Sequence, residues 1–445
     1  MNRQINMLEG SLADKILMYA LPLAATGILQ QLFNAADVAV VGNFVGKEAM
    51  AAVGSNTAII GLLVNLFIGI SLGTNVVIAH AIGKGDQEEI GKAVHTSILV
   101  AVFGGIFLLI IGELLAPAIL KLTGVPDEVF DMAVLYLRVY LLGMPVILLY
   151  NFESAIFRGQ GNTRTPLIAL ACSGVINVVL NVIFVVVLHR TVDGVAMATA
   201  ISNTISSIFL FYKLLHSRDE IRIRMPEFGI DIKVLRRILQ IGVPAGIQTS
   251  MFSIANIIIQ SAINSLGATV MAGSSAAFNL EIFAYYMLNS FGQACTTFVG
   301  QNYGAGKLDR CKRSFILCFL MDYIFTGAVC ILILVFGHQL LAIFNNDPEV
   351  IQSGYLRLAY IFFAYIFSLW QDVGSGYLRG FGLSFVPAVI SLLGVCGSRV
   401  LWIMTAFKRV PTFTTIMLVY PISLGLTGLV ILLSILIIRP SRKYA

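Results

Sequence analysis

Residues 157–166 read FRGQGNTRTP, and about 221 positions later residues 378–387 read LRGFGLSFVP. The arginine, both glycines and the proline coincide. Further pairs coincide at nearly the same offset, namely 20–34 with 242–256, 79–86 with 300–307, and 136–140 with 355–359. This spacing divides the chain into two halves of similar architecture.

The composition is that of an integral membrane protein. The 445 residues are 58% hydrophobic and 12% charged, with a mean hydropathy of +0.89, whereas a soluble domain carries roughly 25% charged residues. The apolar stretches are continuous, which favours helices over a β-barrel. Their length predicts about twelve spans, near residues 14–41, 50–80, 93–120, 130–157, 163–188, 193–215, 235–265, 271–301, 314–337, 352–378, 385–407 and 412–438.

We therefore expect an all-α polytopic membrane protein with two six-helix lobes. Six spans are an even number, so the lobes have the same orientation and form a parallel repeat, as transporters do. The predicted divisions are an N-terminal lobe at 1–215, a polar cytoplasmic linker at 216–237 and a C-terminal lobe at 238–445. Four prolines are predicted to kink spans: Pro22, Pro145, Pro244 and Pro421.

The basic residues predict the orientation. With both termini cytoplasmic, 21 of the 29 lysines and arginines fall on the inner side and five on the outer side, as the positive-inside rule requires. This bias accounts for the net charge of +6, so we expect no nucleic-acid partner. The predicted location is the cell membrane. No C-x-x-C pair is present, so neither a disulfide framework nor a zinc site is expected.

The chain resembles the multidrug and toxic compound extrusion (MATE) transporters. The resemblance covers nearly the whole chain and rests on the order and duplication of several motifs. These are Asp37 with Gly42 and Gly46, AIGKGD (81–86), FRGQGNTRTP (157–166), Asn177 with Asn181, GVAMATAISN (194–203), VGQNYGAGK (299–307) and GYLRGFG (376–382).

Asp37 is the best candidate for a functional residue, because a charge at the centre of a span costs about 2.5–3.5 kcal/mol on insertion scales. Asn177 and Asn181 are four residues apart and share one helix face. The resemblance implies that this face and Thr199 lie near Asp37. These oxygen ligands could hold a sodium ion at Asp37, Asn177 and Asn181, or the carboxyl group could take up a proton. Interhelical hydrogen bonding is the structural alternative for the asparagines.

The family resemblance is imperfect here, since some relatives carry a second carboxylate where this chain has Asn181. Further candidates for a substrate cavity or a site in the second lobe are Gln30, Asn34, Gln248, Glu281, Asp372 and Arg399. An ion pair of Arg399 with Glu281 or Asp372 is expected, because buried charges are generally paired. Glu153 and Asp322 are interpreted as facing water on the inner side.

The predicted function is export of organic cations or other amphipathic compounds by alternating access, in exchange for H⁺ or Na⁺ and without a cofactor. The protein would act as a monomer in the lipid bilayer on a small-molecule substrate. The alternatives are a lipid-linked oligosaccharide flippase or an exporter of a natural metabolite. An enzyme is not expected, because the chain has no HExxH, GxSxG or GxxxxGK[ST] motif.

Overall fold

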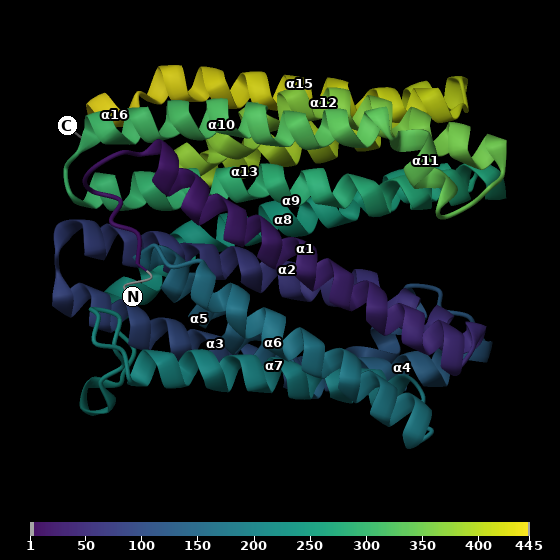
Figure 1. Ribbon diagram of the computed structural model, residues 1–445, viewed down its shortest axis with the longest axis horizontal. Helices are drawn as coiled ribbons and strands as arrows, with labels where there is room; N and C mark the ends of the chain where they lie inside the picture. The colour runs from purple at the N-terminus through teal and green to yellow at the C-terminus, as the bar shows by residue number, and fades with distance from the viewer. Residues whose placement is uncertain (1–3, 444–445) are drawn as a thin grey trace. The chain divides into compact units, whose positions relative to one another are not determined.

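The computed structural model describes residues 4–443, and this part of the chain folds into helices without a strand (Figure 1). The α-helices are α1 (Ala13–Phe44), α2 (Lys47–Lys84), α3 (Gln87–Leu122), α4 (Asp127–Leu142), α5 (Met144–Gln160), α6 (Arg164–Val182), α7 (Val192–Leu215), α8 (Ile232–Asn264), α9 (Ala268–Gly304), α10 (Leu308–Val335), α11 (Gly337–Ala342), α12 (Pro348–Gly380), α13 (Phe385–Ser391), α14 (Ser398–Trp402), α15 (Phe413–Ile438) and α16 (Pro440–Lys443). Short π-helical turns follow α6, α13 and α14.

Each predicted span coincides with a helix or a run of helices. Among the described residues, ten helical segments are long and apolar enough to cross a membrane, and the bent pair α4 and α5 makes an eleventh. The remaining predicted span, 271–301, falls within α9, which is 37 residues long but rich in small and polar residues. The all-α polytopic fold is therefore confirmed.

A bend occurs at the predicted kink near Pro145. The axes of α4 and α5 differ by 49° across the break at Gly143. Proline has no backbone N–H and is tolerated in the first turn of a helix, so it starts α5 rather than continuing α4. Pro22, Pro244 and Pro421 lie inside α1, α8 and α15.

The chain forms two compact units. Unit 1 consists of Gln4, Ile5 and Ala25–Gly246, and unit 2 consists of Asn6–Ala24 and the chain from Ile247 to Lys443. The divisions fall inside α1 and α8, shortly after Pro22 and Pro244, which the sequence repeat aligns with each other. The linker predicted at 216–237 and the first half of α8 therefore belong to unit 1.

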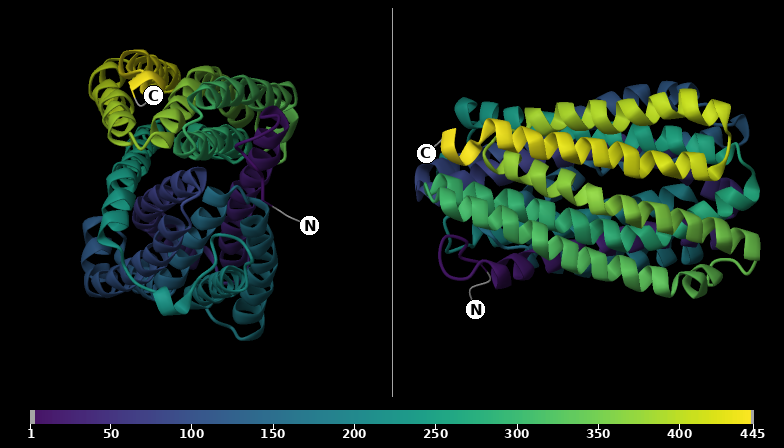
Figure 2. Two further views of the ribbon diagram at one scale, coloured as in Figure 1. Left: turned by 90° about the vertical axis from the view of Figure 1, so that its left-hand side faces the viewer. Right: turned by 90° about the horizontal axis from the view of Figure 1, so that it is seen from above.

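In unit 1, α5 is the central helix. It packs against α2, α3 and α7, while α6 lies along α7 (Figure 1). Phe152 and Ile156 of α5 are fully buried. In unit 2, α12 has the corresponding central position and packs against α9, α10 and α15 (Figure 2).

The linker is attached to α3 by buried polar groups. The backbone N–H of Arg224 donates to His95 Nε2 at 3.1 Å, and that of Asp231 donates to Thr96 Oγ1 at 3.0 Å. Asp231 then caps α8, because its Oδ1 accepts from the backbone N–H groups of Val234 and Lys233. These hydrogen bonds to the charged form, that of Val234 foremost, lower the pKa of Asp231.

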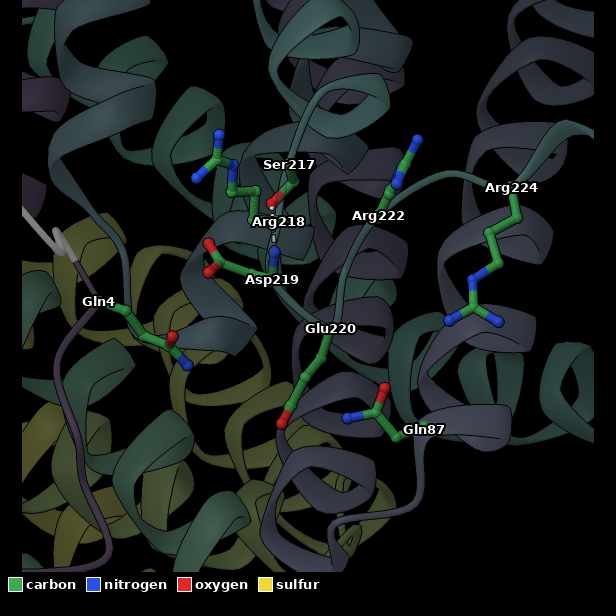
Figure 3. A pocket seen from close by; sticks show the side chains of 8 residues that line it. All are labelled: Gln4, Gln87, Ser217, Arg218, Asp219, Glu220, Arg222 and Arg224. Atoms are coloured by element: carbon green, nitrogen blue, oxygen red, sulfur yellow. Dashed lines mark hydrogen bonds between the residues drawn. The ribbon is translucent and has the colours of Figure 1, made fainter.

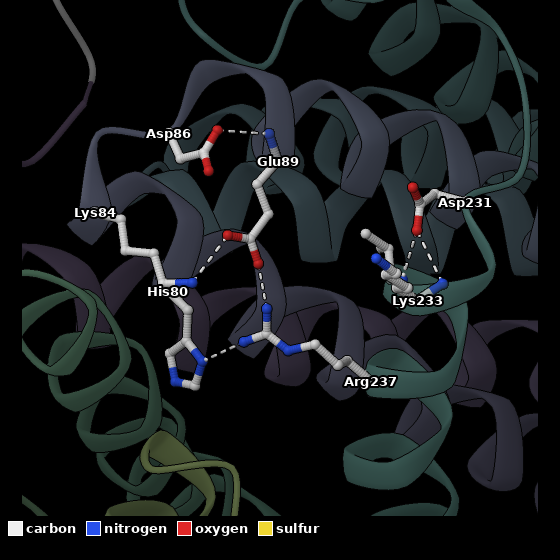
Figure 4. Close-up of polar contacts among 8 residues, drawn as sticks. His80, Lys84, Asp86, Glu89, Asp231, Lys233 and Arg237 are labelled. Carbon is white, nitrogen blue, oxygen red and sulfur yellow. Dashed lines mark hydrogen bonds and ion pairs between the residues drawn. The ribbon is translucent and has the colours of Figure 1, made fainter. Parts of the chain in front are cut away.

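Charged residues hold the start of α8 in unit 1 (Figure 4). Glu89 of α3 accepts from Arg237 of α8 and, at 2.9 Å, from Lys84 of α2. The second terminal nitrogen of Arg237 lies 3.3 Å from His80 Nδ1. Further along α8 the backbones of α2 and α8 nearly touch, since a Cβ on Gly73 would lie 2.2 Å from the carbonyl oxygen of Ile238.

Candidate functional site

A ring-on-glycine contact brings α1 against α6 inside unit 1. A Cβ on Gly174 of α6 would lie 1.8 Å from Cε2 of Phe33, so only glycine leaves room for this ring. Asp37 follows Phe33 by one helical turn, and Asn177 follows Gly174 by nearly one turn. The contact therefore sets the carboxylate of α1 opposite the asparagine face of α6.

The four residues predicted to form the ion site do meet. Asn181 Nδ2 donates to Asp37 Oδ1 at 2.5 Å and to Asn177 Oδ1 at 3.2 Å. Thr199 of α7 donates from Oγ1 to Asp37 Oδ2 at 3.2 Å, and Asn177 Nδ2 lies 3.5 Å from the same hydroxyl. Asp37 is 7% exposed, and Asn177 and Asn181 are buried. The contacts are shown by the structure, and the role in ion binding remains a prediction.

Two features of this cluster bear on cation binding. Asn181 Oδ1 is buried and has no hydrogen-bond partner, whereas buried polar atoms are generally paired. The Thr199 hydroxyl lies between two acceptors, 3.2 Å from Asp37 Oδ2 and 3.0 Å from the carbonyl oxygen of Val195. One hydroxyl carries one proton, so it can donate fully to only one of them at a time.

Sequence reasoning missed two tyrosines beside this cluster. Tyr136 and Tyr140 of α4 lie within electrostatic range of Asp37. Both belong to YLRVY (136–140) and lie one turn apart, so they face the same side of α4. The motif marks the repeat of the two halves, and nothing in it indicates which neighbour its face meets.

Gln30 and Asn34 do not join the cluster. They precede Asp37 on α1 by two turns and one turn, respectively, and both side chains are exposed in the described structure. Neither makes any of the hydrogen bonds that join the four clustered residues.

In unit 2 the predicted ion pair between Arg399 and Glu281 is wrong, because Glu281 pairs with Arg357. Glu281 accepts from Arg357 of α12 through Nη2 at 2.8 Å and Nε at 3.1 Å. The hydroxyl of Tyr365 donates to the other carboxylate oxygen at 3.3 Å, and Ser274 accepts from Arg357 at 2.8 Å. Arg357 lies within a predicted span and is matched to Glu281 only by the packing of α9 on α12, which the spacing of the residues along the chain does not reveal.

Arg399 forms no ion pair with Glu281 or Asp372. Its Nη1 donates to Asn256 Oδ1 at 2.8 Å, and its guanidinium lies 4.6 Å from the ring centre of Tyr420. The neutral amide and the ring face stabilise this cation where a carboxylate was predicted.

Asp372 is instead within electrostatic range of Arg379, which follows it by two turns on α12. Arg379 donates to Gln248 Oε1 at 3.3 Å, and Gln248 Nε2 donates to Ser391 at 2.8 Å. Asp372 and Gln248, both predicted candidates, are thus connected through an arginine that the prediction did not include.

The interpretation that Glu153 and Asp322 face water is wrong, because both side chains are 0% exposed. Ser207 of α7 donates to Glu153 Oε2 at 3.0 Å, and Thr326 donates to Asp322 Oδ1 at 2.6 Å. The second oxygen of each carboxylate has no hydrogen-bond partner. Glu153 is buried because it lies on α5, the central helix of unit 1.

A polar cavity of about 410 Å³ lies at the linker, apart from these residues (Figure 3). Its arginine side chains, Arg218, Arg222 and Arg224, point in different directions rather than towards one centre. Within the part of the chain that the structure describes, no three His, Cys, Asp or Glu side chains group as ligands for a metal ion. The Asp37 cluster is therefore the best-formed candidate site.

Comparison with known proteins gives similarity along almost the whole chain. The MatE family model matches residues 22–183 and 244–404, once in each half. Probable multidrug resistance protein YoeA of Bacillus subtilis is 27% identical over 390 residues, 86% of this chain and 84% of that protein. Probable multidrug resistance protein NorM of Thermotoga maritima is 27% identical over 389 residues, 86% of this chain and 83% of that protein.

A solved structure has the same fold. The crystal structure of MATE in complex with MaL6 matches with a TM-score of 0.92 at 22% identity and covers 100% of both chains. The two matches of the family model agree with the internal repeat that the sequence indicates.

Proposed function

The chain belongs to the multidrug and toxic compound extrusion (MatE) family of membrane transporters, and on that premise we propose that it is a cation-coupled secondary antiporter. It exports organic cations or other amphipathic compounds by alternating access, driven by the inward movement of H⁺ or Na⁺. Two relatives named probable multidrug resistance proteins support this substrate class.

The observation that carries the proposal is the buried carboxylate of Asp37 among neutral polar groups. Among the described residues it forms no salt bridge, and a buried charge without a partner is costly. A cation that moves into the cluster supplies the missing charge. An outgoing organic cation and an incoming H⁺ or Na⁺ therefore compete for one negative group, which is the requirement for antiport.

The same side chains serve either coupling ion. When Asp37 Oδ2 carries a proton, its O–H group can donate a hydrogen bond to Thr199 Oγ1, and the Thr199 hydroxyl then donates to the carbonyl oxygen of Val195. Sodium requires converging oxygens, which Asp37, Asn177 and Thr199 supply. Rotation of the Asn181 amide adds its unpartnered Oδ1 to this set.

The experiment uses purified protein in liposomes with rhodamine 6G, a fluorescent lipophilic cation. A proton gradient and a sodium gradient are imposed separately on wild type and Asp37→Asn. We expect one gradient to drive rhodamine transport and Asp37→Asn to reduce the driven rate at least a hundredfold. Asp127→Asn, a change of an exposed carboxylate at the start of α4, is the matched control.

Either of two results would refute the proposal. One is transport by Asp37→Asn against a gradient at the wild-type rate. The other is transport by wild type under neither gradient, which would indicate a flippase or an exporter of a natural metabolite instead.

The orientation and assembly are part of the same proposal. The distribution of basic residues supports a cytoplasmic linker and cytoplasmic termini. The protein is a multi-pass protein of the plasma membrane, and a monomer holds the complete Asp37 cluster within unit 1.

A further inference from the structure

The buried carboxylate of Glu153 has no part in the Asp37 cluster, and its environment resembles that of Asp37. Its side chain is 0% exposed, it accepts one hydrogen bond from Ser207, and its Oε1 has no partner. Among the described residues no lysine or arginine forms a salt bridge with it. Tyr150, one turn earlier on α5, is a titratable group within electrostatic range.

A purely structural role does not account for this group. A glutamine would accept the same hydrogen bond from Ser207 without the cost of an ionisable group in the membrane interior. Structural carboxylates at such depth are paired with cations or fully hydrogen-bonded, as Glu281 is with Arg357 and Tyr365. Glu153 has neither arrangement.

Polar side chains of α7 occupy the interval between the Asp37 cluster and Glu153. Thr199, Asn203, Ser206 and Ser207 are spaced i, i+4, i+7 and i+8, so they lie on one face of the helix. Thr199 donates to Asp37 at one end, and Ser207 donates to Glu153 at the other. Their separation of eight positions corresponds to about 12 Å of helix.

The interval holds further hydroxyl groups rather than a closed apolar core. Ser206 Oγ lies 2.5 Å from Ser173 Oγ of α6, and Ser173 precedes Asn177 of the Asp37 cluster by one turn. Asn203 Nδ2 donates to the carbonyl oxygen of Thr199 at 2.8 Å. The longest step along α7, from Thr199 to Asn203, is four residues or about 6 Å of helix rise, a distance that one water molecule can bridge.

Glu153 lies between this polar face and the end of α5 that the charge distribution assigns to the cytoplasm. Gln160, the last residue of α5, follows it by two turns, and its buried Nε2 has no hydrogen-bond partner. Asn162 and Thr163 continue the polar groups into the next loop and are also buried. A proton on Glu153 is thus about 10 Å from the end of its helix.

We propose that Glu153 is a second proton-binding site, which receives the proton of Asp37 and releases it to the cytoplasm. This inference rests on the proposed antiport and assigns H⁺ as the coupling ion. The proton leaves the Asp37 carboxyl group, and each hydroxyl or water on the path accepts one proton and passes on another. Asp37 regains its negative charge, the Glu153 carboxylate becomes neutral, and Glu153 then loses the proton to cytoplasmic water.

The test compares two modes of transport in liposomes containing the full-length protein and rhodamine 6G. Proton-driven exchange requires the proton path, whereas exchange of rhodamine for rhodamine requires no net proton movement. For Glu153→Gln we expect the proton-driven rate to fall at least tenfold while rhodamine–rhodamine exchange stays within twofold of wild type. Glu128→Gln, an exposed change on α4, is the control and should alter neither rate.

A second variant tests the path without changing Glu153. Ser206→Ala removes a hydroxyl of the path that contacts Ser173 of α6 and neither carboxylate, and we expect at least a threefold loss of the proton-driven rate alone. If Glu153→Gln fails to fold, Ser206→Ala alone tests the proton path. Wild-type proton-driven rates in the folded variants, or equal losses in both transport modes, would overturn the inference.

The outcomes for Asp37 separate this inference from the proposed function. If Asp37→Asn loses proton-driven transport and Glu153→Gln does not, the second proton site is wrong and the antiporter stands. If sodium alone drives wild type, the antiporter again stands and the proton path is wrong. If neither ion drives wild type, both are wrong.

Discussion

The ion pair of Glu281 and Arg357 allows a quantitative test of the structure in unit 2. We consider Arg357→Met, which keeps most of the side-chain volume and removes the cation. The side chains of Arg357 and Glu281 are 6% and 12% exposed, and Arg357 donates to Glu281 from two nitrogens and to Ser274 from a third. The variant therefore leaves the Glu281 carboxylate buried and without its cation.

The expected loss is large. Removing one partner of a buried ion pair costs about 3–5 kcal/mol, because the remaining charge stays desolvated. Removing both charges together avoids most of this cost, so Glu281→Gln with Arg357→Met should recover at least half of the lost stability. In contrast, Lys312 and Asp309 form an exposed pair at 3.6 Å, and Lys312→Met should change stability little.

The assay is equilibrium unfolding in mixed detergent micelles for wild type, the two single variants and the double variant. The resulting double-mutant cycle measures the coupling between the two side chains. We expect the double variant to transport rhodamine at nearly the wild-type rate per folded molecule, because the pair stabilises α9 against α12. Additive losses below about 1 kcal/mol for each single variant would refute the buried pair.

Two further predictions concern the Asp37 cluster. Gly174→Ala should reduce the transport rate at least tenfold, because the new Cβ displaces Phe33 and separates α1 from α6. Adding Phe33→Ala to this variant should restore the transport rate. Gly61→Ala is the control and should leave the rate unchanged, because a Cβ there meets nothing within 4 Å. Thr199→Val should lower the proton-driven rate by one to two powers of ten, since a hydrogen bond to a charged group contributes about 1.5–3 kcal/mol, whereas Thr199→Ser should retain most of the rate. Normal transport rates in Gly174→Ala or in Thr199→Val would contradict the geometry of the cluster.

The sequence was sufficient for the membrane class, the spans and the asparagine face of the Asp37 cluster. Apolar runs long enough to cross a bilayer must be helical, because in the bilayer the backbone N–H and C=O groups can form hydrogen bonds only within the segment. The four-residue spacing of Asn177 and Asn181 likewise places both on one face whatever the neighbours are. The family resemblance added Thr199 and the proximity of this face to Asp37.

The partners of the remaining charges could not be predicted in the same way. Arg399 was expected to bind a carboxylate but contacts Asn256 and the ring of Tyr420. Arg357 neutralises Glu281, and the sequence does not indicate this pairing. A rule that buried charges are paired does not name the partner, because many polar groups of one lobe lie at similar depths.

By itself, then, the sequence determined what is local or repeated: the helical character of the apolar spans, the duplication and the one face that carries two asparagines. Tertiary structure alone decided which faces meet. Phe33 reaches Gly174 and so sets Asp37 against Asn181, and the central place of α5 buries Glu153 rather than exposing it to water. The physical reason is that helix periodicity is a property of the backbone, whereas contacts between helices depend on how side chains far apart in the chain fill a shared volume.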